Sequence, residues 1–380
     1  MRSASALLSL CIAALSLGVK GNEVDATYIF AAFICIAMFL VLLQREDVVR
    51  VDSTAKGAVY LSSIFLLYAS ISSLLTWSVN IDYLSVVVTL PFLLLPLSFL
   101  VFWVLGLARE DWDRISVERV CVHAALIFCA VLIVGNPSAF LSSLLEGARF
   151  TWTEFRAVTP LPAIASALLI WRYGFKVVLR WEFWLLATYI YATKYINWLV
   201  LLAFALPLRY IALKFPRLWL SAILVMCIVV IDTLIFINWR EAVTFAPTEF
   251  ERIIELRIAY EAFMEQPLFG MGFGQFFADG SYSIHNLLAY VLSSGGGIGL
   301  VLFCPLIVLY SRIQGARSEF IVVVYLILTA TAASYKLPSI QFCIGMALAA
   351  FAAPARLDVR PGVSRSPGPL HISSSFDRPS

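Results

Sequence analysis

The feature that most constrains the fold is a succession of apolar runs separated by polar segments. Several runs reach the about 20 residues that a helix needs to cross a bilayer. Hydrophobic residues make up 61% of the chain and charged residues 13%, about half the charged share of a soluble protein. The sequence therefore predicts an all-α, polytopic membrane helix bundle of about 12 transmembrane helices. The twelve runs lie at 4–19, 26–43, 57–79, 83–107, 117–135, 158–171, 181–193, 196–213, 218–237, 286–310, 320–335 and 339–354.

Two of these runs, 158–171 and 181–193, are short for a full crossing. We expect them to tilt, to pack inside the bundle or to re-enter the membrane. Pro160 and Pro162 favour an irregular start for the first of them.

Basic residues are concentrated in every second connecting segment, which predicts the orientation. The positive-inside rule places these segments and both termini in the cytoplasm, and the intervening segments outside. The two long outer segments are 136–157 and 238–285. The basic positions are Arg45, Arg50, Lys56, Arg109, Arg114, Arg119, Arg172, Lys176, Arg180, Arg209, Lys214, Arg217, Arg312 and Arg317.

The chain divides at the larger outer segment. We expect transmembrane helices 1–9 within 1–237, one large outer loop at 238–285, helices 10–12 within 286–355 and a disordered cytoplasmic tail at 356–380, which is rich in Pro, Ser and Arg. Residues 1–19 alternatively form a cleaved signal peptide, although no A-x-A site follows them. Both readings leave every later loop on the same side.

Cysteine and charge content argue against several functions. All seven cysteines lie in apolar runs without a CxxC pair, as small buried hydrophobic residues do. The net charge of +3 gives no indication of a nucleic-acid partner. Histidine, cysteine and acidic residues show no metal-ligand spacing. We therefore predict neither a metal nor another cofactor.

The large outer loop contains a predicted helix at 249–265. Thr248 followed by Glu251 is typical of a capping box, and Pro267 ends the helix. Helical periodicity predicts an apolar sector and an opposite polar sector on it. The apolar sector contains Phe250, Ile253, Ile254 and Met264, and the sector expected to face away contains Glu251, Arg252 and Glu255.

Two charged residues, Arg257 and Glu261, fall within the apolar sector. One explanation is that they pair at i, i+4 or extend to the surface. The other is that Arg257 points into a membrane-facing cavity to bind an anion, with Glu261 orienting it. The residues alone leave both explanations open.

A glycine-rich turn and a histidine follow this helix. Gly270, Gly272 and Gly274 provide backbone freedom for a close approach. His285 and Asn286 then open a membrane helix that Gly295–Gly297 interrupts. His285 is a candidate general base, because imidazole exchanges protons near neutral pH; the alternative is a hydrogen-bonded residue at the membrane surface. Of the other histidines, His123 is expected in the core and His371 lies in the tail.

Four parts of this region together resemble the O-antigen ligase and O-antigen/exopolysaccharide polymerase superfamily of bacterial envelope glycosyltransferases. They are Arg257, the segment 262–274 (AFMEQPLFGMGFG), His285-Asn286-Leu287 and Gly297-Ile298-Gly299-Leu300. The arrangement of twelve runs with one large late outer loop agrees with that family more loosely along the whole chain. Upstream, Phe155-Arg156-Ala157 is similar to an outer-loop arginine of the family. Thr193-Lys194 is similar to its Thr-x-Ser-Arg junction, with lysine in place of arginine.

The resemblance implies a metal-independent transfer at the periplasmic face of the bacterial inner membrane. The donor would be a glycan on undecaprenyl pyrophosphate, and the acceptor a glycan or a lipid A core. Arg257 would hold the pyrophosphate, with Arg156, Lys194 and Glu261 assisting. His285 would take the proton from the acceptor hydroxyl, and Asn286 would cap the helix or position His285.

Three alternatives stay open at this point. Ligases and polymerases of the family differ in their acceptor, and the sequence does not separate them. A membrane transporter or flippase is a second class, although the sequence shows no inverted repeat and no charges distributed along several spans. A non-catalytic scaffold of envelope polysaccharide assembly is the third, because Lys194 replaces the planar guanidinium of arginine by a point charge.

Overall fold

The computed structural model describes residues 8–10, 12–13, 53–77, 93–103, 117–147, 150, 160–216, 218–273, 284–330 and 338–352, and these contain helices and no strands. The all-α prediction is confirmed for them. The helices are α3 (Ser53–Trp77), a helix at Leu93–Trp103, α5 (Val117–Gly135), α6 (Pro137–Leu145), α7 (Leu161–Tyr173), η2 (Gly174–Leu179), α8 (Trp181–Thr193), α9 (Ile196–Lys214), α10 (Leu220–Ile237), α11 (Trp239–Phe245), η3 (Pro247–Glu249), α12 (Phe250–Glu265), α14 (Leu287–Arg312), α15 (Ala316–Ala330) and α16 (Pro338–Ala352).

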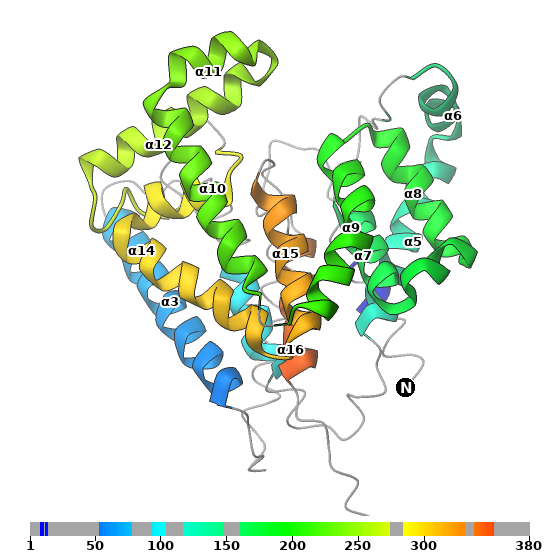
Figure 1. Ribbon diagram of the computed structural model, residues 1–380, viewed down its shortest axis with the longest axis horizontal. Helices are drawn as coiled ribbons and strands as arrows, with labels where there is room; N and C mark the ends of the chain where they lie inside the picture. Colours follow the sequence, from blue (N-terminus) through cyan, green and yellow to red (C-terminus); the bar gives the residue numbers. More distant parts are fainter. Residues whose placement is uncertain are drawn as a thin grey trace, which may run out of the picture.

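The helices form two groups on either side of α15 (Figure 1). One group contains α3, α10, α12 and α14, and the other contains α5, α7, α8 and α9. Helix α15 contacts members of both groups, and most of its side chains are buried. Because its sequence is apolar around most of its circumference, it can pack against neighbours on several sides.

Within the described residues, five helical segments are long and apolar enough to cross a membrane: Ser53–Ser72, Glu118–Gly135, Leu161–Leu179, Leu220–Ile237 and Leu287–Arg312. The run expected to be short at 158–171 continues through η2, so the helical segment reaches Leu179. Helix α8 stays short, with 13 residues. The runs at 4–19 and 26–43 and the tail at 356–380 lie largely or wholly outside the described residues, so the number twelve stays a prediction.

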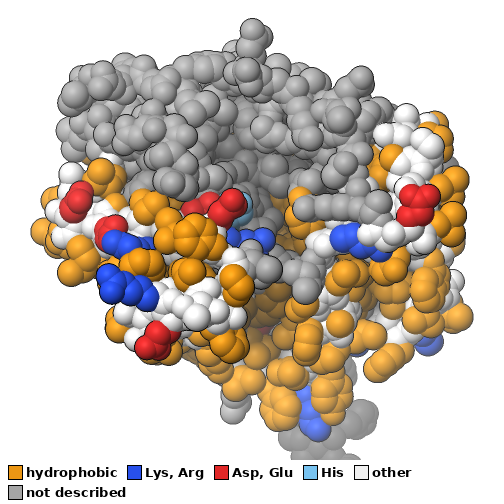
Figure 2. Space-filling view, turned by 90° about the horizontal axis from the view of Figure 1, so that it is seen from above, with side chains coloured by type: hydrophobic (Ala, Val, Ile, Leu, Met, Phe, Trp, Pro, Cys, Tyr) orange, Lys and Arg blue, Asp and Glu red, His pale blue; other side chains and the backbone are white. Residues whose placement is uncertain are grey.

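The described parts of three predicted basic segments meet at one end of the bundle, whereas Arg45, Arg50, Arg109 and Arg114 lie outside the described residues. Arg172, at the end of α7, and Arg317, at the start of α15, both form ion pairs with Glu118 at the start of α5. The other end carries α11 and α12, at the top of Figure 1. Viewed from that end, charged side chains gather over the α11–α12 side and over the opposite side, and the surface is hollowed between them (Figure 2).

The predicted outer segment 238–285 begins with α11, η3 and α12. The helix expected at 249–265 is confirmed as α12. The capping box is wrong: the N-cap residue is Glu249, which makes no side-chain capping hydrogen bond. The physical reason is that Pro247 starts a 3₁₀ turn through Glu249, so position 248 lies inside a turn and not at the cap.

Candidate functional site

Helix α14 is broken at Gly296, and a turn from another part of the chain fills the break. Gly296 has φ 59° and ψ −161°, which are not helical values. The break frees backbone groups on both sides of it, and buried backbone groups need partners. The turn at 267–272 supplies them. Gly297 and Ile298 donate to the carbonyls of Pro267 and Leu268 (2.8 and 3.2 Å).

The same turn also uses the carbonyls that the break releases. Met271 and Gly272 donate to the carbonyls of Ser293 and Ser294, each at 2.9 Å. The Tyr68 hydroxyl of α3 donates to the carbonyl of Gly295 at 2.6 Å. The turn after α12 and the first half of α14 are thereby held in fixed register.

Glycine is required on both sides of this contact. A Cβ atom on Gly270 would lie 2.5 Å from the Gly296 nitrogen, and one on Gly296 would lie 2.5 Å from the Leu268 carbonyl oxygen. Both residues have positive φ, at 68° and 59°. The sequence indicated a close backbone approach at the Gly-Met-Gly turn, and the structure identifies the opposite surface as the Gly-Gly-Gly break in α14.

Asn286 caps α14. Its Oδ1 accepts hydrogen bonds from the backbone N–H groups of Leu288 and Ala289, at 2.9 and 3.1 Å. Its Nδ2 donates to Asp232 Oδ2 of α10 at 2.8 Å. Asp232 is 6% exposed, in the most apolar of the candidate spans. A carboxylate in such a helix is costly unless it is paired, so the amide both caps one helix and satisfies a buried acid in another.

His285 forms a close pair with Glu255 of α12. The His285 Nδ1 and Glu255 Oε2 atoms are 2.5 Å apart, and the backbone N–H of His285 donates to the same oxygen at 3.1 Å. The Glu255 side chain is 7% exposed and that of His285 38%. An ionised carboxylate only accepts hydrogen bonds, so it places the proton of a neutral ring on Nδ1. The Nε2 lone pair is then left to accept a proton.

The position of Glu255 corrects the face prediction for α12. The periodicity placed Glu255 with the solvent-facing charges, whereas the buried side of α12 contains Glu255 together with Ile253, Leu256, Ala259 and Ala262. Phe250 and Met264, predicted apolar-sector residues, are exposed by 49% and 67%. The partner that makes burial of Glu255 favourable is His285, thirty residues later, and helix periodicity carries no information about it.

A cavity of 390 Å³ adjoins this pair. Its lining includes Asp232, Glu255, His285 and Asn286, with apolar side chains from α10 and α12 around them. Arg252 also lines it, paired with Glu249 at 2.7 Å. Glu249 lines the cavity as well, so it combines an imidazole, three carboxylates, two of them buried, and an arginine in an apolar wall. This is the composition expected of a binding site for a partly polar ligand.

Arg257 and Glu261, the other two predicted site residues of α12, pair with each other. Arg257 Nε donates to Glu261 Oε1 at 2.6 Å. The Arg257 guanidinium lies 4.2 Å from the centre of the Trp239 ring of α11. Arg257 is not part of the lining of the 390 Å³ cavity. The i, i+4 pair that the sequence allowed is therefore present.

The remaining predicted site residues are not brought to His285 within the described part of the chain. Lys194 ends α8 with φ 55° and lies 3.6 Å above the Tyr191 ring. No hydrogen bond or ion pair joins its described side chain to Arg257 or His285. Helices α8 and α12 stand on opposite sides of Figure 1. Arg156 lies outside the described residues.

Two further contacts hold α10 and α12 together beside the cavity. Tyr260 stacks on Phe236 with ring centres 4.9 Å apart, and its hydroxyl lies 3.3 Å from Thr233 Oγ1. Burial raises the pKa of the Tyr260 phenol, which favours the protonated, hydrogen-bonding form. These contacts fix the helix that carries Glu255 against the helix that carries Asp232.

Comparison with models of protein families and with curated proteins finds no match for this chain. Sequence reasoning missed Glu255, Asp232 and Arg252. An acidic residue within an apolar span was the available signal for Asp232, and no local signal distinguished Glu255 from the other glutamates of its helix.

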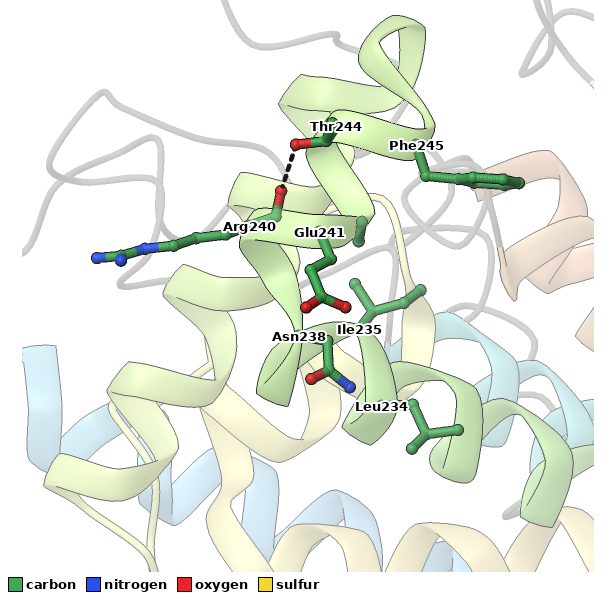
Figure 3. Close-up of a pocket in the computed structure, with 8 residues that line it drawn as sticks. Leu234, Ile235, Asn238, Arg240, Glu241, Thr244 and Phe245 are labelled. Carbon is green, nitrogen blue, oxygen red and sulfur yellow. Dashed lines mark hydrogen bonds between the residues drawn. The ribbon is translucent and has the colours of Figure 1, made fainter.

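A second and larger cavity of 810 Å³ lies along α10 and α11 (Figure 3). Leu234, Ile235, Asn238 and Glu241 line its lower part, and Phe245 projects from the end of α11. Phe245 is 93% exposed. Ile235 also lines the cavity beside His285, so the two cavities adjoin at this residue of α10.

Proposed function

We propose that this chain is a metal-independent glycosyltransferase of the O-antigen ligase/polymerase type. It would move a glycan from undecaprenyl pyrophosphate to an acceptor sugar hydroxyl in lipopolysaccharide or exopolysaccharide assembly. The observation that carries the proposal is the His285–Glu255 pair. A buried carboxylate holds one ring nitrogen, and the ring borders a cavity at one end of a bundle of membrane-type helices.

The proposed reaction uses His285 as the general base. Nε2 takes the proton of the acceptor hydroxyl while the oxygen attacks the anomeric carbon of the donor sugar. The new bond joins that oxygen to the anomeric carbon, and the bond from the anomeric carbon to the pyrophosphate oxygen breaks. Undecaprenyl pyrophosphate leaves with the electron pair. Glu255 orients the ring and stabilises the imidazolium that forms, as a carboxylate beside a catalytic histidine does.

The leaving pyrophosphate needs positive charge, which we assign to α12. Arg257 and Glu261 are partly exposed, at 34% and 49% of their side chains. An exposed ion pair of this kind contributes at most about 1 kcal/mol, so a pyrophosphate can replace Glu261 as the partner of Arg257 at small cost. The Trp239 ring keeps the guanidinium in place meanwhile. Arg156 and Lys194 are proposed to assist, and Arg252 is a further candidate because it lines the cavity.

The proposal places the protein in the bacterial inner membrane, as a multi-pass protein with His285 on the periplasmic side. The donor lipid would enter from the bilayer, and the acceptor, a growing glycan or a lipid A core, from the periplasm. The segregation of basic residues at the end of the bundle away from α12 supports this orientation.

The proposal is tested by the surface glycans of a deletion strain, separated by size, after restoring wild-type, His285→Ala or His371→Ala copies. His371→Ala is the matched control, because it removes a histidine from the tail. We expect it to restore the wild-type profile and His285→Ala to leave the deletion profile. The amount of each variant in the membrane is measured alongside, since His285→Ala removes a partner of buried Glu255.

The profile also separates the candidate activities. Long chains that stay on undecaprenyl pyrophosphate indicate a ligase, and single repeat units on that lipid indicate a polymerase. Full activity of His285→Ala would refute the base assignment. A deletion profile identical to the parent's would refute the glycosyltransferase proposal and favour a transporter, a flippase or a non-catalytic scaffold.

A further inference from the structure

A second polar cavity lies at the end of the bundle opposite His285. It has a volume of 390 Å³ and is bounded by the start of α5, the end of α7 and the start of α8. Val122, Leu168 and Leu169 form its apolar part. Glu118 lines this cavity and pairs with Arg317, which lies just beyond the end of α14. His285 precedes the start of α14, so the two cavities lie near opposite ends of that helix.

Arginines dominate the charge around this cavity. Arg119, Arg172 and Arg180 line it, together with Glu118 and Glu182. Arg317 adds a fourth guanidinium through its ion pair with Glu118. Among the described charged side chains at the cavity, guanidinium groups therefore outnumber carboxylates.

The arginine and glutamate side chains of the cavity differ in their exposure to solvent. The side chains of Arg172 and Arg180 are 34% and 42% exposed, whereas those of Glu118 and Glu182 are 10% and 14% exposed. The carboxylates thus lie below the guanidinium groups, and the accessible surface is cationic. A ligand that enters the cavity meets the arginines first.

The arginines are also held in place. The guanidinium groups of Arg172 and Arg180 lie 5.3 and 4.9 Å from the centre of the Tyr173 ring. Glu182 accepts from Arg180 Nη2 at 2.7 Å, while the buried Arg180 Nε has no hydrogen-bond partner among the described residues. Arginines fixed in this way bind a phosphate oxygen with little loss of conformational entropy.

His123 lies at the same cavity, which corrects the sequence expectation of a core residue. Its side chain is exposed, one helical turn after Arg119 on α5. Helix α5 thus places Arg119 and His123 at one cavity from successive turns. Their side chains provide polar contacts at two depths in that cavity.

The surface beside the cavity is strongly apolar. Phe175 and Leu179 of η2 are each 80% exposed, and Trp181 at the start of α8 is 65% exposed. Aromatic and aliphatic side chains at the level of arginines are typical of the membrane–water interface. A ligand bound here would have a phosphate in the cavity and acyl chains along η2 and α8.

We propose that this cavity binds the head group of an anionic phospholipid with two phosphodiester charges, of the cardiolipin type. Fixed guanidinium groups above buried carboxylates offer donors to phosphate oxygens, and basic pockets between membrane helices recognise head groups of this kind. The proposal is independent of the proposed glycosyltransferase activity.

The test is native mass spectrometry of the purified full-length chain titrated with cardiolipin, with phosphatidylglycerol and phosphatidylcholine as comparison lipids. Arg172→Gln/Arg180→Gln is the test variant. Lys176→Gln is the matched control, because Lys176 lies in η2 between them, is exposed, and does not line the cavity. We expect the double variant to bind cardiolipin about thirtyfold more weakly, from the loss of two interfacial charges, and the control to bind as the wild type does.

A second variant, Leu169→Trp, fills the apolar part of the cavity and leaves every charge in place. It is expected to lose cardiolipin binding too, which keeps the test decisive if the double variant does not fold. Equal weakening by Lys176→Gln would show general attraction to a basic surface and would overturn the proposal. Displacement of cardiolipin by inorganic phosphate at similar concentration would also overturn it, in favour of a site for a soluble anion.

Discussion

The contact between the glycine turn and the break in α14 makes a sharp prediction about Gly296→Ala. The alanine Cβ would lie 2.5 Å from the Leu268 carbonyl oxygen and 2.6 Å from the Gly270 nitrogen. Both are backbone atoms, so no side-chain rotation can relieve the overlap. The residue also has φ 59° and ψ −161°, a combination that L-residues with a Cβ strongly disfavour.

The expected cost has two parts. Backbone strain at such a position amounts to about 1–3 kcal/mol. Displacement of the turn weakens the hydrogen bonds of Gly297 and Ile298 to Pro267 and Leu268, each of which contributes about 0.5–1.5 kcal/mol. We therefore expect Gly296→Ala to lower the free energy of unfolding by about 3 kcal/mol or more.

Two other glycines provide matched controls. Gly315 also has φ 59° but nothing within 4 Å of an added Cβ, so Gly315→Ala reports the cost of a positive φ without the overlap. Gly57 lies in α3, where an added Cβ meets Leu309 at an ordinary 3.8 Å, so Gly57→Ala should be neutral or stabilising by up to about 1 kcal/mol.

The measurement is the unfolding temperature of each purified variant in mild detergent, followed by tryptophan fluorescence. We expect Gly57→Ala to unfold at the highest temperature, Gly315→Ala lower and Gly296→Ala lowest by a wide margin. If Gly296→Ala unfolds at or above the temperature of Gly315→Ala, the turn does not occupy the break in α14 and the reasoning is refuted.

Three further predictions concern buried polar contacts. Glu255→Gln keeps the shape of the residue but removes the carboxylate that orients the His285 ring. Glycan transfer in the complementation assay should therefore fall by up to about 10⁴-fold, as for the same change beside a catalytic histidine, with unchanged protein level. An undiminished rate would exclude a positioning role. Glu319 is 4% exposed and accepts a hydrogen bond from the backbone N–H of Ser221 at 2.7 Å. Glu319→Ala should therefore lower the free energy of unfolding by about 1–3 kcal/mol, and Glu319→Gln should lower it by less. Equal unfolding temperatures of the two variants would contradict this. Tyr68→Phe removes a 2.6 Å hydrogen bond to the Gly295 carbonyl, which the break in α14 leaves without its helical partner. In the same thermal assay this should reduce the free energy of unfolding by about 1–3 kcal/mol. No loss of stability would mean that another donor satisfies that carbonyl.

Parts of the candidate site follow from local sequence. Asn286 was expected to cap the helix or to position His285. The structure gives it the capping role, which needs only a side-chain oxygen placed before the first turn of a helix. The interruption of α14 was recognised from its three consecutive glycines, since glycine adopts the positive φ that a break requires.

Other parts were wrong or invisible in the sequence. The capping box failed because Pro247 directs the chain into a 3₁₀ turn just before α12. Glu255 was assigned to the exposed side because a glutamate in an isolated amphipathic helix is most stable in water. Burial becomes favourable only with a partner, and the partner lies on another helix.

The sequence by itself determined the elements whose causes are local or additive: the apolar helices, the polar outer segment, the cap on α14 and the glycine break. Only the tertiary structure decided which of these elements meet. It paired His285 with Glu255, Asn286 with Asp232 and the turn at 267–272 with the break in α14. The physical reason is that the free energy of a buried charge or an unpaired backbone group depends on atoms tens of residues away, and helical periodicity records only the face on which a residue lies.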